Sequence, residues 1–159
     1  MSKTFLELGI LAELVERLSE IQITVPTKVQ EKSIPLILNN TEDVVVLAKT
    51  GTGKTAAFGL PLLQLIDAKS TKIEALILAP TRELGQQIYT SLVSFSSESQ
   101  QTTITSICGG IPIKPQIERL KETTHIVVAT PGRLVDLVKR DAINIKDIRV
   151  LETIKEGKT

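Results

Sequence analysis

The chain has 159 residues, of which 42% are hydrophobic and 23% charged, as is ordinary for a globular domain with a buried core. Its net charge is +1 and aromatic residues make up 3%, so neither a strong basic field nor base stacking can be its main way of binding nucleic acid. The single cysteine excludes an intrachain disulfide framework, and no apolar run is long enough for a membrane span. These features predict a soluble domain without a membrane partner and favour a cytoplasmic location.

The first forty residues predict a helical region packed on the same domain as the rest of the chain. Apolar residues recur with helical spacing from Glu7 to Ile21, and charged residues lie between them. Pro26 interrupts this pattern, and Thr27 is placed as the N-cap of a second helix that continues to Leu38.

From residue 41 to residue 151 the pattern predicts alternating strands and helices. The predicted strands are Val44–Leu47, Ala75–Leu78, Thr103–Ile107, Ile126–Ala129 and Ile148–Leu151. The predicted helices are Lys54–Ile66, Arg82–Phe95, Ile113–Lys121 and Gly132–Lys139. Continuous apolar strands in this alternation indicate an α/β domain whose parallel β-sheet has helices on both faces. Ligands of such a sheet bind at the carboxyl ends of its strands.

A glycine-rich segment, Ala48-Lys-Thr-Gly-Thr-Gly-Lys-Thr55, follows the first predicted strand and opens a helix. Gly51 and Gly53 allow the backbone to approach a polyphosphate, and the N–H groups at the start of the helix favour negative charge. Lys54 can reach the β- and γ-phosphates, and the Thr55 hydroxyl is placed to bind Mg²⁺. The order strand, glycine loop, helix therefore predicts a nucleotide triphosphate site.

Three further loops follow predicted strands and carry hydroxyl groups, glycines or arginines. They are Pro80-Thr-Arg-Glu-Leu84, Gly109-Gly110 and Thr130-Pro-Gly-Arg133. Taken singly, each is also an ordinary helix cap or turn. Together, beside a phosphate loop, they indicate binding of a sugar-phosphate backbone without base reading.

In this order the motifs resemble those of the first RecA-like domain of a DEAD-box RNA helicase. Pro26-Thr-Lys-Val-Gln30 is similar to the Q motif of that family, and Phe5 lies upstream of it as the isolated aromatic residue of the family does. The resemblance covers roughly residues 5–150 and implies a RecA-like P-loop fold. It also implies ATP with Mg²⁺ as cofactors and single-stranded RNA as a partner, contacted through its backbone and independently of sequence.

The resemblance implies a role for individual residues. Gln30 would bind the adenine edge, Phe5 would stack on the ring and Thr27 would support the loop. The implied ATP-binding residues are Phe5, Ile23, Thr27, Gln30, Ala48, Lys49, Thr50, Gly51, Thr52, Gly53, Lys54 and Thr55, and Thr55 would bind Mg²⁺. The implied RNA-binding residues are Pro80, Thr81, Arg82, Gly109, Gly110, Thr130, Gly132 and Arg133.

The sequence departs from the family pattern in three places. Gln22-Ile23 stands where the family usually has glycine and an aromatic residue, so one wall of the adenine pocket would be aliphatic. After Ile148-Arg-Val-Leu151 the sequence reads Glu152-Thr-Ile-Lys155 instead of Asp-Glu-Ala-Asp, and neither the Ser-Ala-Thr motif nor a second RecA-like domain is in this sequence. Because Glu152 lacks the acidic residues beside it, it is a poor candidate for a catalytic base, and no complete catalytic set is predicted.

We hypothesise that a stretch is missing between Val150 and Glu152, so that residues 152–159 form a C-terminal tail after it. Two function classes remain open. The chain is either the ATP- and RNA-binding part of an enzyme that hydrolyses ATP and remodels RNA, itself inactive in isolation, or a non-catalytic ATP- and RNA-binding module that acts by interaction only. A small-molecule kinase has no support, because no lid or substrate-binding arginine cluster is visible.

Overall fold

The protein is described by a computed structural model that covers residues 2–39, 42–49, 51 and 53–155. Contacts divide the chain into two compact units, Met1–Leu65 with Ser91–Gln100, and Ile66–Thr90 with Gln101–Thr159. Residues 42–65 therefore belong to the same unit as the first forty residues. Among the helices of the described residues, none has the length and apolar character needed to cross a membrane.

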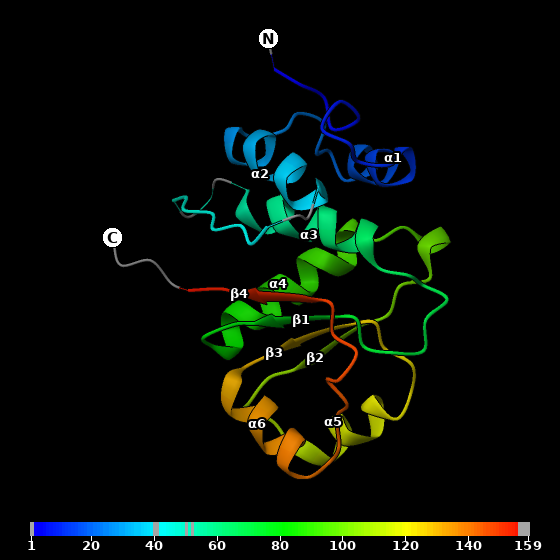
Figure 1. Ribbon diagram of the computed structural model, residues 1–159, viewed down its shortest axis with the longest axis vertical. Helices are drawn as coiled ribbons and strands as arrows, with labels where there is room; N and C mark the ends of the chain where they lie inside the picture. Colours follow the sequence, from blue (N-terminus) through cyan, green and yellow to red (C-terminus); the bar gives the residue numbers. More distant parts are fainter. Residues whose placement is uncertain (1, 40–41, 50, 52, 156–159) are drawn as a thin grey trace. The chain divides into compact units, whose positions relative to one another are not determined.

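The first unit is helical. It contains α1 (Ala12–Glu20), α2 (Lys28–Asn39), α3 (Lys54–Leu65), the end of α4 (Arg82–Phe95) and a short 3-10 helix, η1 (Glu98–Gln100) (Figure 1). Helix α2 contacts α3. Gly59 of α3 lies so close to α4 that an added Cβ would be 2.8 Å from the Leu92 side chain, which would have to shift to make room.

Helix α1 is shorter than the sequence predicted. The helical spacing began at Glu7, but residues 5–9 form turns and the helix begins at Ala12, where the Gln64 side chain accepts a hydrogen bond from the Leu11 N–H at 2.8 Å. Helix α1 ends in a left-handed turn at Gln22, whose φ is 65°, with the Ile23 N–H bonded to the Leu18 carbonyl at 2.8 Å. Glycine is favoured in this conformation, which gives a physical reason for the glycine usual in the family at this position.

The prediction of a strand at Val44–Leu47 was wrong for the structure described. Residues 43–49 have no strand assignment, and Val45 and Leu47 are 85% and 91% exposed. A β-branched run becomes a strand only when a neighbouring strand accepts its hydrogen bonds. None of the four strands in the described sheet pairs with this segment, so its apolar composition alone does not make it a strand.

The second unit contains a parallel sheet with the order β2-β3-β1-β4. The strands are β1 (Ala75–Leu78), β2 (Ile104–Ile107), β3 (Ile126–Ala129) and β4 (Val150–Thr153). The last residues of β1, β3 and β2 are in register, because Leu78 and Ile107 both pair with Ala129. The loops that follow these three strands therefore start side by side.

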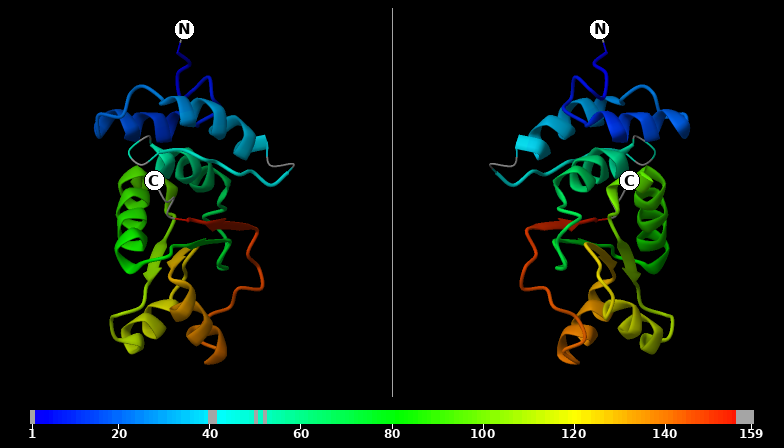
Figure 2. Two further views of the ribbon diagram at one scale, coloured as in Figure 1. Left: turned by 90° about the vertical axis from the view of Figure 1, so that its left-hand side faces the viewer. Right: turned by 90° about the vertical axis from the view of Figure 1, so that its right-hand side faces the viewer.

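Helices cover both faces of this sheet, as the sequence predicted. Helices α5 (Ile113–Leu120) and α6 (Pro131–Lys139) pack with Leu76 and Val127, and Figure 2 shows these two helices together (Figure 2). An added Cβ on Gly85 of α4 would be 2.7 Å from Cys108 Sγ and 3.9 Å from Val128. Since Val127 and Val128 point to opposite faces of the strand, α4 lies on the face away from α5 and α6.

Strand β4 begins two residues later than the sequence predicted. The buried Glu74 side chain forms an ion pair with Arg149, and the Glu74 carbonyl accepts the N–H groups of Arg149 and Val150 at 2.8 and 3.1 Å. These bonds fix the entry to β4, so Ile148 and Arg149 precede the strand. Val150–Thr153 then pairs along its whole length with Ala75–Leu78, and the hypothesis of a missing stretch between Val150 and Glu152 stays a prediction.

Candidate phosphate-binding sites

Two glycines of the predicted phosphate loop before α3 lie within the described residues, and both have left-handed backbone conformations. Gly51 and Gly53 have φ values of 80° and 84°, which side chains rarely tolerate. Lys54 and Thr55 are half-buried in the first turn of α3, where backbone N–H groups have no carbonyl within the helix. Thr50 and Thr52, also predicted to bind ATP, lie outside the described residues, whereas Ala48 and Lys49 are half-buried and exposed, respectively.

Gln30 is hydrogen-bonded to this loop. Its amide Nε2 donates to the Gly53 carbonyl at 3.1 Å, and its Oε1 accepts the Thr27 N–H at 3.0 Å. Thr27 caps α2 as predicted, because its Oγ1 accepts the Gln30 N–H at 3.4 Å. Both functions of the amide are therefore used within the chain, next to the predicted nucleotide site.

The other predicted adenine contacts differ in exposure. Ile23 is half-buried, but the Phe5 side chain is only 2% exposed. Phe5 is a core residue in this structure, and a stacking role requires that a face of the ring become accessible.

The three loops of the second unit lie together at the carboxyl edge of the sheet, as predicted. The Arg82 guanidinium Nη1 donates to the Gly110 carbonyl at 3.4 Å, joining the β1–α4 loop to the β2–α5 loop. Gly110 has a φ of 86°, and an added Cβ would be 2.8 Å from Arg82 Nη1. Glycine at this position therefore allows the guanidinium to lie against the loop.

The β3–α6 loop is joined to the same glycines. The Gly109 N–H donates to Thr130 Oγ1 at 2.8 Å, and Arg133 Nη2 donates to the Ile111 carbonyl at 2.8 Å. Arg82 and Arg133 are thus both tied to the segment that begins with Gly109-Gly110. We call these three linked loops, Pro80–Arg82, Gly109–Ile111 and Thr130–Arg133, the phosphate edge.

Two members of the phosphate edge begin helices. Thr81 Oγ1 accepts the Leu84 N–H at 3.2 Å as the cap of α4, and Pro131 is the first residue of α6 after Thr130. Gly132 follows with nothing within 4 Å of an added Cβ, so the start of α6 is open there. Helix starts with open approach suit an anion.

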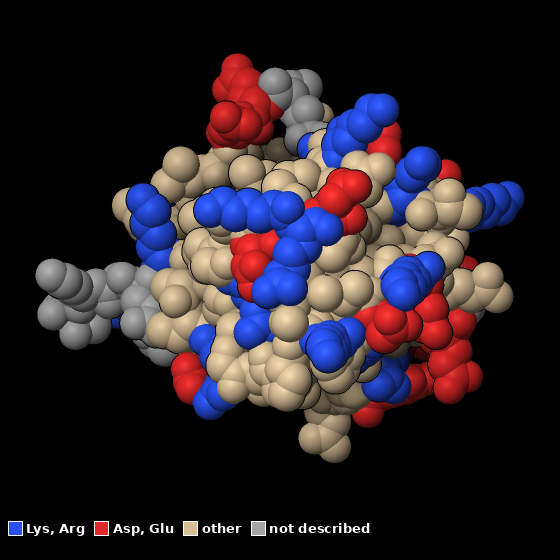
Figure 3. All heavy atoms as spheres, turned by 90° about the horizontal axis from the view of Figure 1, so that it is seen from below, with Lys and Arg blue, Asp and Glu red and all other residues tan. Residues whose placement is uncertain are grey.

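The chain has 19 Lys and Arg residues and 18 Asp and Glu residues, so its positive and negative charges nearly balance. Figure 3 shows Lys and Arg side chains interspersed with Asp and Glu side chains on the face seen from below (Figure 3). Arg82 Nη2 lies 3.6 Å from Glu83 Oε1, and both side chains are exposed. Attraction of an anion therefore depends on the short-range geometry of the phosphate edge.

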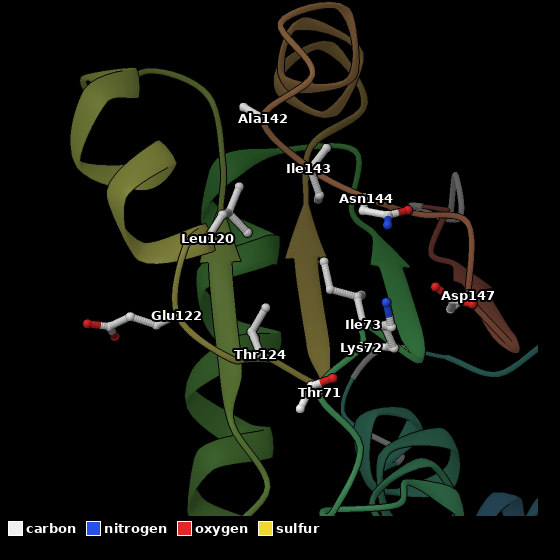
Figure 4. Close-up of a pocket in the computed structure, with 10 residues that line it drawn as sticks. All are labelled: Thr71, Lys72, Ile73, Leu120, Glu122, Thr124, Ala142, Ile143, Asn144 and Asp147. Carbon is white, nitrogen blue, oxygen red and sulfur yellow. The ribbon is translucent and has the colours of Figure 1, made fainter.

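A small pocket of about 170 Å³ lies elsewhere in the second unit. It is bounded by the chain that enters β1, the turn before β3 and the connection from α6 to β4 (Figure 4). The residues around it are Thr71, Lys72, Ile73, Leu120, Glu122, Thr124, Ala142, Ile143, Asn144 and Asp147. It contains no residue of the phosphate edge, because these segments precede the strands and the phosphate edge follows them.

Glu152 lies in β4, where the resemblance places the acidic motif. Burial raises the pKa of its carboxyl above the ordinary value of 4.5. Within the described part of the chain, no group of three or more His, Cys, Asp or Glu residues could hold a metal ion. Glu152 is therefore a partly desolvated carboxylate that belongs to no such group among the described residues.

The arrangement defines a class: a RecA-like P-loop domain, with a glycine loop before a helix and a parallel sheet whose carboxyl-end loops carry arginines and hydroxyls. The chain belongs to the DEAD/DEAH box helicase family, whose model matches residues 27–153. It is 45% identical over 147 residues to the DEAD-box ATP-dependent RNA helicase CshA of Streptococcus pneumoniae, and 39% identical over 145 residues to the ATP-dependent RNA helicase DeaD of Escherichia coli. These alignments cover 92% and 91% of this chain but only 28% and 23% of the relatives.

Solved structures are similar over nearly the whole chain. A DEAD box protein from the hyperthermophile Methanococcus jannaschii matches with a TM-score of 0.89 and 36% identity, over 96% of this chain and 42% of the other. A variant of Saccharomyces cerevisiae Dbp5 bound to RNA and ADP BeF3 matches with a TM-score of 0.85 and 29% identity, over 96% of this chain and 38% of the other. The predicted fold class and family are therefore confirmed.

Sequence reasoning missed Gln116, which accepts a hydrogen bond from Arg133. Gln116 is one of the few buried polar residues, at 4% exposed, and lies in α5 with Ile113, Ile117 and Leu120. The sequence could have indicated it, because Gln116 has the same helical spacing as these apolar residues. An amide buried in such a stripe needs a polar partner.

The raised pKa of Glu152 gives a testable dependence of stability on pH. The folded state disfavours the charged carboxylate. The free energy of unfolding is therefore highest below about pH 4.5, where Glu152 is protonated in both states, and it falls as the pH rises through the raised pKa. We therefore expect Glu152→Gln to melt at a higher temperature than the wild type at pH 7.5 and at the same temperature at pH 4. Thermal unfolding followed by circular dichroism at both pH values measures this. An equal difference at both values would show that the effect of the substitution is not electrostatic.

Proposed function

We propose that this chain is the ATP- and RNA-binding first RecA-like domain of a DEAD-box RNA helicase. The full-length protein would couple ATP binding and hydrolysis to the remodelling of RNA duplexes. The observation that carries the proposal is the phosphate edge, where Arg82 and Arg133 are both bonded to the loop that contains Gly109 and Gly110. We also propose that residues 1–40 support the ATP-binding core and that the protein is cytoplasmic, which its single, buried cysteine favours.

The nucleotide would bind at the glycine loop of the first unit. The positive φ values of Gly51 and Gly53 bring the backbone into a form that can surround phosphates, and Lys54 lies at the start of α3 to add a positive charge. An amide that both donates and accepts, as Gln30 does toward Gly53 and Thr27, can also match the paired groups of adenine. The amide has a second N–H and a second lone pair on its oxygen, so adenine could bind while these internal bonds are kept.

Mg²⁺ would enter with the nucleotide. The donors present fit this role, because Thr55 supplies one hydroxyl and Mg²⁺ is commonly held by few protein groups together with substrate phosphates. When bound, the ion neutralises the developing charge on the phosphates. The contribution of this chain is to place the hydroxyl and Lys54 in the first turn of one helix.

Single-stranded RNA would bind along the phosphate edge. The donors there are guanidinium groups, hydroxyls and helix N-termini, which contact phosphates and sugars and carry no direct base information. Aromatic residues are scarce, so stacking adds little and the binding would not depend on sequence.

A second candidate function is a catalytically inactive ATP- and RNA-binding module that acts by interaction only. The observation that favours it is the unbroken strand Val150–Thr153, which carries a single carboxylate at Glu152 instead of an acidic cluster. The family resemblance implies that one residue of the acidic motif would hold the metal and another would orient the attacking water.

The nucleotide site is tested with Lys54→Ala. Loss of a charge-assisted contact to phosphate is expected to weaken ADP binding by on the order of 1.5–3 kcal/mol. Fluorescence titration with labelled ADP measures the affinity, and Lys32→Ala, an exposed lysine on α2 of the same unit, is the matched control. Equal ADP affinity in the Lys54 variant and the wild type would exclude this site. Titration with labelled GDP extends the test to the base, since a site that reads adenine through Gln30 should bind GDP more weakly.

The two candidate functions are separated by phosphate release. Because the chain lacks the acidic cluster, we expect no Mg²⁺-dependent release of phosphate from ATP by the 159-residue protein, with or without RNA. A phosphate-binding fluorescent reporter measures the rate, with Lys54→Ala as the background. Release that depends on Lys54 would show that the chain is itself an ATPase.

The RNA site is tested by the salt dependence of binding. Arg82→Met and Arg133→Met should each weaken binding of a labelled single-stranded RNA and reduce the slope of log affinity against log salt by about 0.7. Fluorescence anisotropy over a salt series on two unrelated RNA sequences measures both quantities. Arg119→Met removes the same charge from the last turn of α5 and should leave the slope unchanged. A strong preference for one sequence would contradict backbone recognition.

A further inference from the structure

Gln116 is a buried amide that contacts Arg133 of the phosphate edge and the residue just before the Gly109–Ile111 loop. Its Oε1 accepts a hydrogen bond from Arg133 Nη1 at 2.7 Å, and its Nε2 donates to the Cys108 carbonyl at 3.0 Å. Cys108 immediately precedes Gly109, so one side chain joins the start of α6 to the Gly109–Ile111 loop.

The chemistry of the partners fixes the orientation of this amide. Arginine offers only donors and a backbone carbonyl offers only acceptor sites, so the oxygen of Gln116 must face Arg133 and its nitrogen must face Cys108. If the amide were flipped, its N–H groups would face the N–H groups of Arg133, and its oxygen would face the carbonyl oxygen of Cys108. Burial makes that loss large, because water cannot replace either partner at a side chain that is 4% exposed.

Arg133 is consequently held at two points. Nη1 donates to Gln116 and Nη2 donates to the Ile111 carbonyl at 2.8 Å. A guanidinium has five N–H groups, which leaves three without an acceptor among the described residues. The side chain is half-buried, so these groups can still meet a ligand from the solvent side.

We propose that Gln116 is a positioning residue that fixes the Arg133 guanidinium against the Gly109–Ile111 loop, so that its remaining N–H groups are set to receive a backbone phosphate of RNA. The inference rests on the proposed RNA-binding function of the phosphate edge and names the residue that preorganises it. A flexible arginine loses side-chain freedom when it binds a phosphate, whereas one already held by two acceptors loses less.

The test is a double-mutant cycle on RNA binding by the 159-residue chain, measured by anisotropy with a short fluorescein-labelled oligouridine. Gln116→Met keeps the length of the side chain and removes both hydrogen bonds without changing the net charge. It is expected to weaken binding about two- to tenfold, with the salt slope unchanged. In the Arg133→Met background the same substitution should have no further effect, because the residue through which it acts is gone.

A merely structural role would give a different result. Thr105→Val is the matched control, because it removes the hydrogen bond between Thr105 and Thr124, which is buried in the same unit and touches no residue of the phosphate edge. It should lower the melting temperature and leave RNA affinity unchanged. Equal weakening by Gln116→Met in both Arg133 backgrounds, or no weakening in the wild type, would overturn the inference while the proposed function stands. Wild-type affinity in Arg133→Met itself would overturn both.

A spectroscopic measurement covers the case in which Gln116→Met does not fold. In the wild-type protein the Arg133 Nη protons should give separate NMR signals, because two acceptors hinder rotation of the guanidinium. The variant Arg133→Lys keeps the charge but loses the two-point attachment, so it should bind RNA as weakly as expected for Gln116→Met. Fully averaged Nη signals in the wild type, or wild-type affinity in Arg133→Lys, would overturn the inference.

Discussion

The phosphate edge depends on the parallel register of three strands. The strands β1, β3 and β2 end at paired residues, Leu78, Ala129 and Ile107. The loops that follow them therefore begin side by side at one edge of the sheet. Direct hydrogen bonds of 2.8–3.4 Å can then link the three loops through the glycines, the Thr130 hydroxyl and the two arginines. A shift of one residue in any pairing would turn the strand over and move its loop away from the others. The apolar packing of Leu76, Val127 and Ile107 on α5 and α6 therefore helps to keep the three loops together, because it supports that register.

Much of this arrangement could be predicted because the signals were local. Ala75–Leu78 and Ile126–Ala129 are continuous apolar runs buried on both faces, and the structure has strands with these same bounds. Helix α4 likewise begins where Thr81 supplies its cap. In each case the residues that define the element also lie within it or directly beside it.

The wrong or incomplete predictions depended on partners distant in sequence. Val44–Leu47 has the composition of a strand, but no described strand pairs with it. The start of β4 was displaced because Glu74, far away in the chain, binds Arg149 and its backbone. Gln116 was missed for the same reason, since its importance comes from Arg133 and Cys108 and not from its neighbours in α5.

A nearly neutral chain can recognise a polyanion if the cations at its binding site are held in place. Long-range steering is weak at a net charge of +1, so the free energy of binding must come from contacts made within hydrogen-bonding distance. The phosphate edge meets this need by attaching each arginine to a backbone carbonyl, Arg82 to Gly110 and Arg133 to Ile111. The same principle applies at the glycine loop, where Gln30 holds the Gly53 carbonyl. There the amide uses one of its two N–H groups and one of the two lone pairs on its oxygen, so one N–H and one lone pair remain. The two proposed sites thus share one design: a loop is held by a side chain, Arg133 or Gln30, that has more hydrogen-bonding groups than the loop uses.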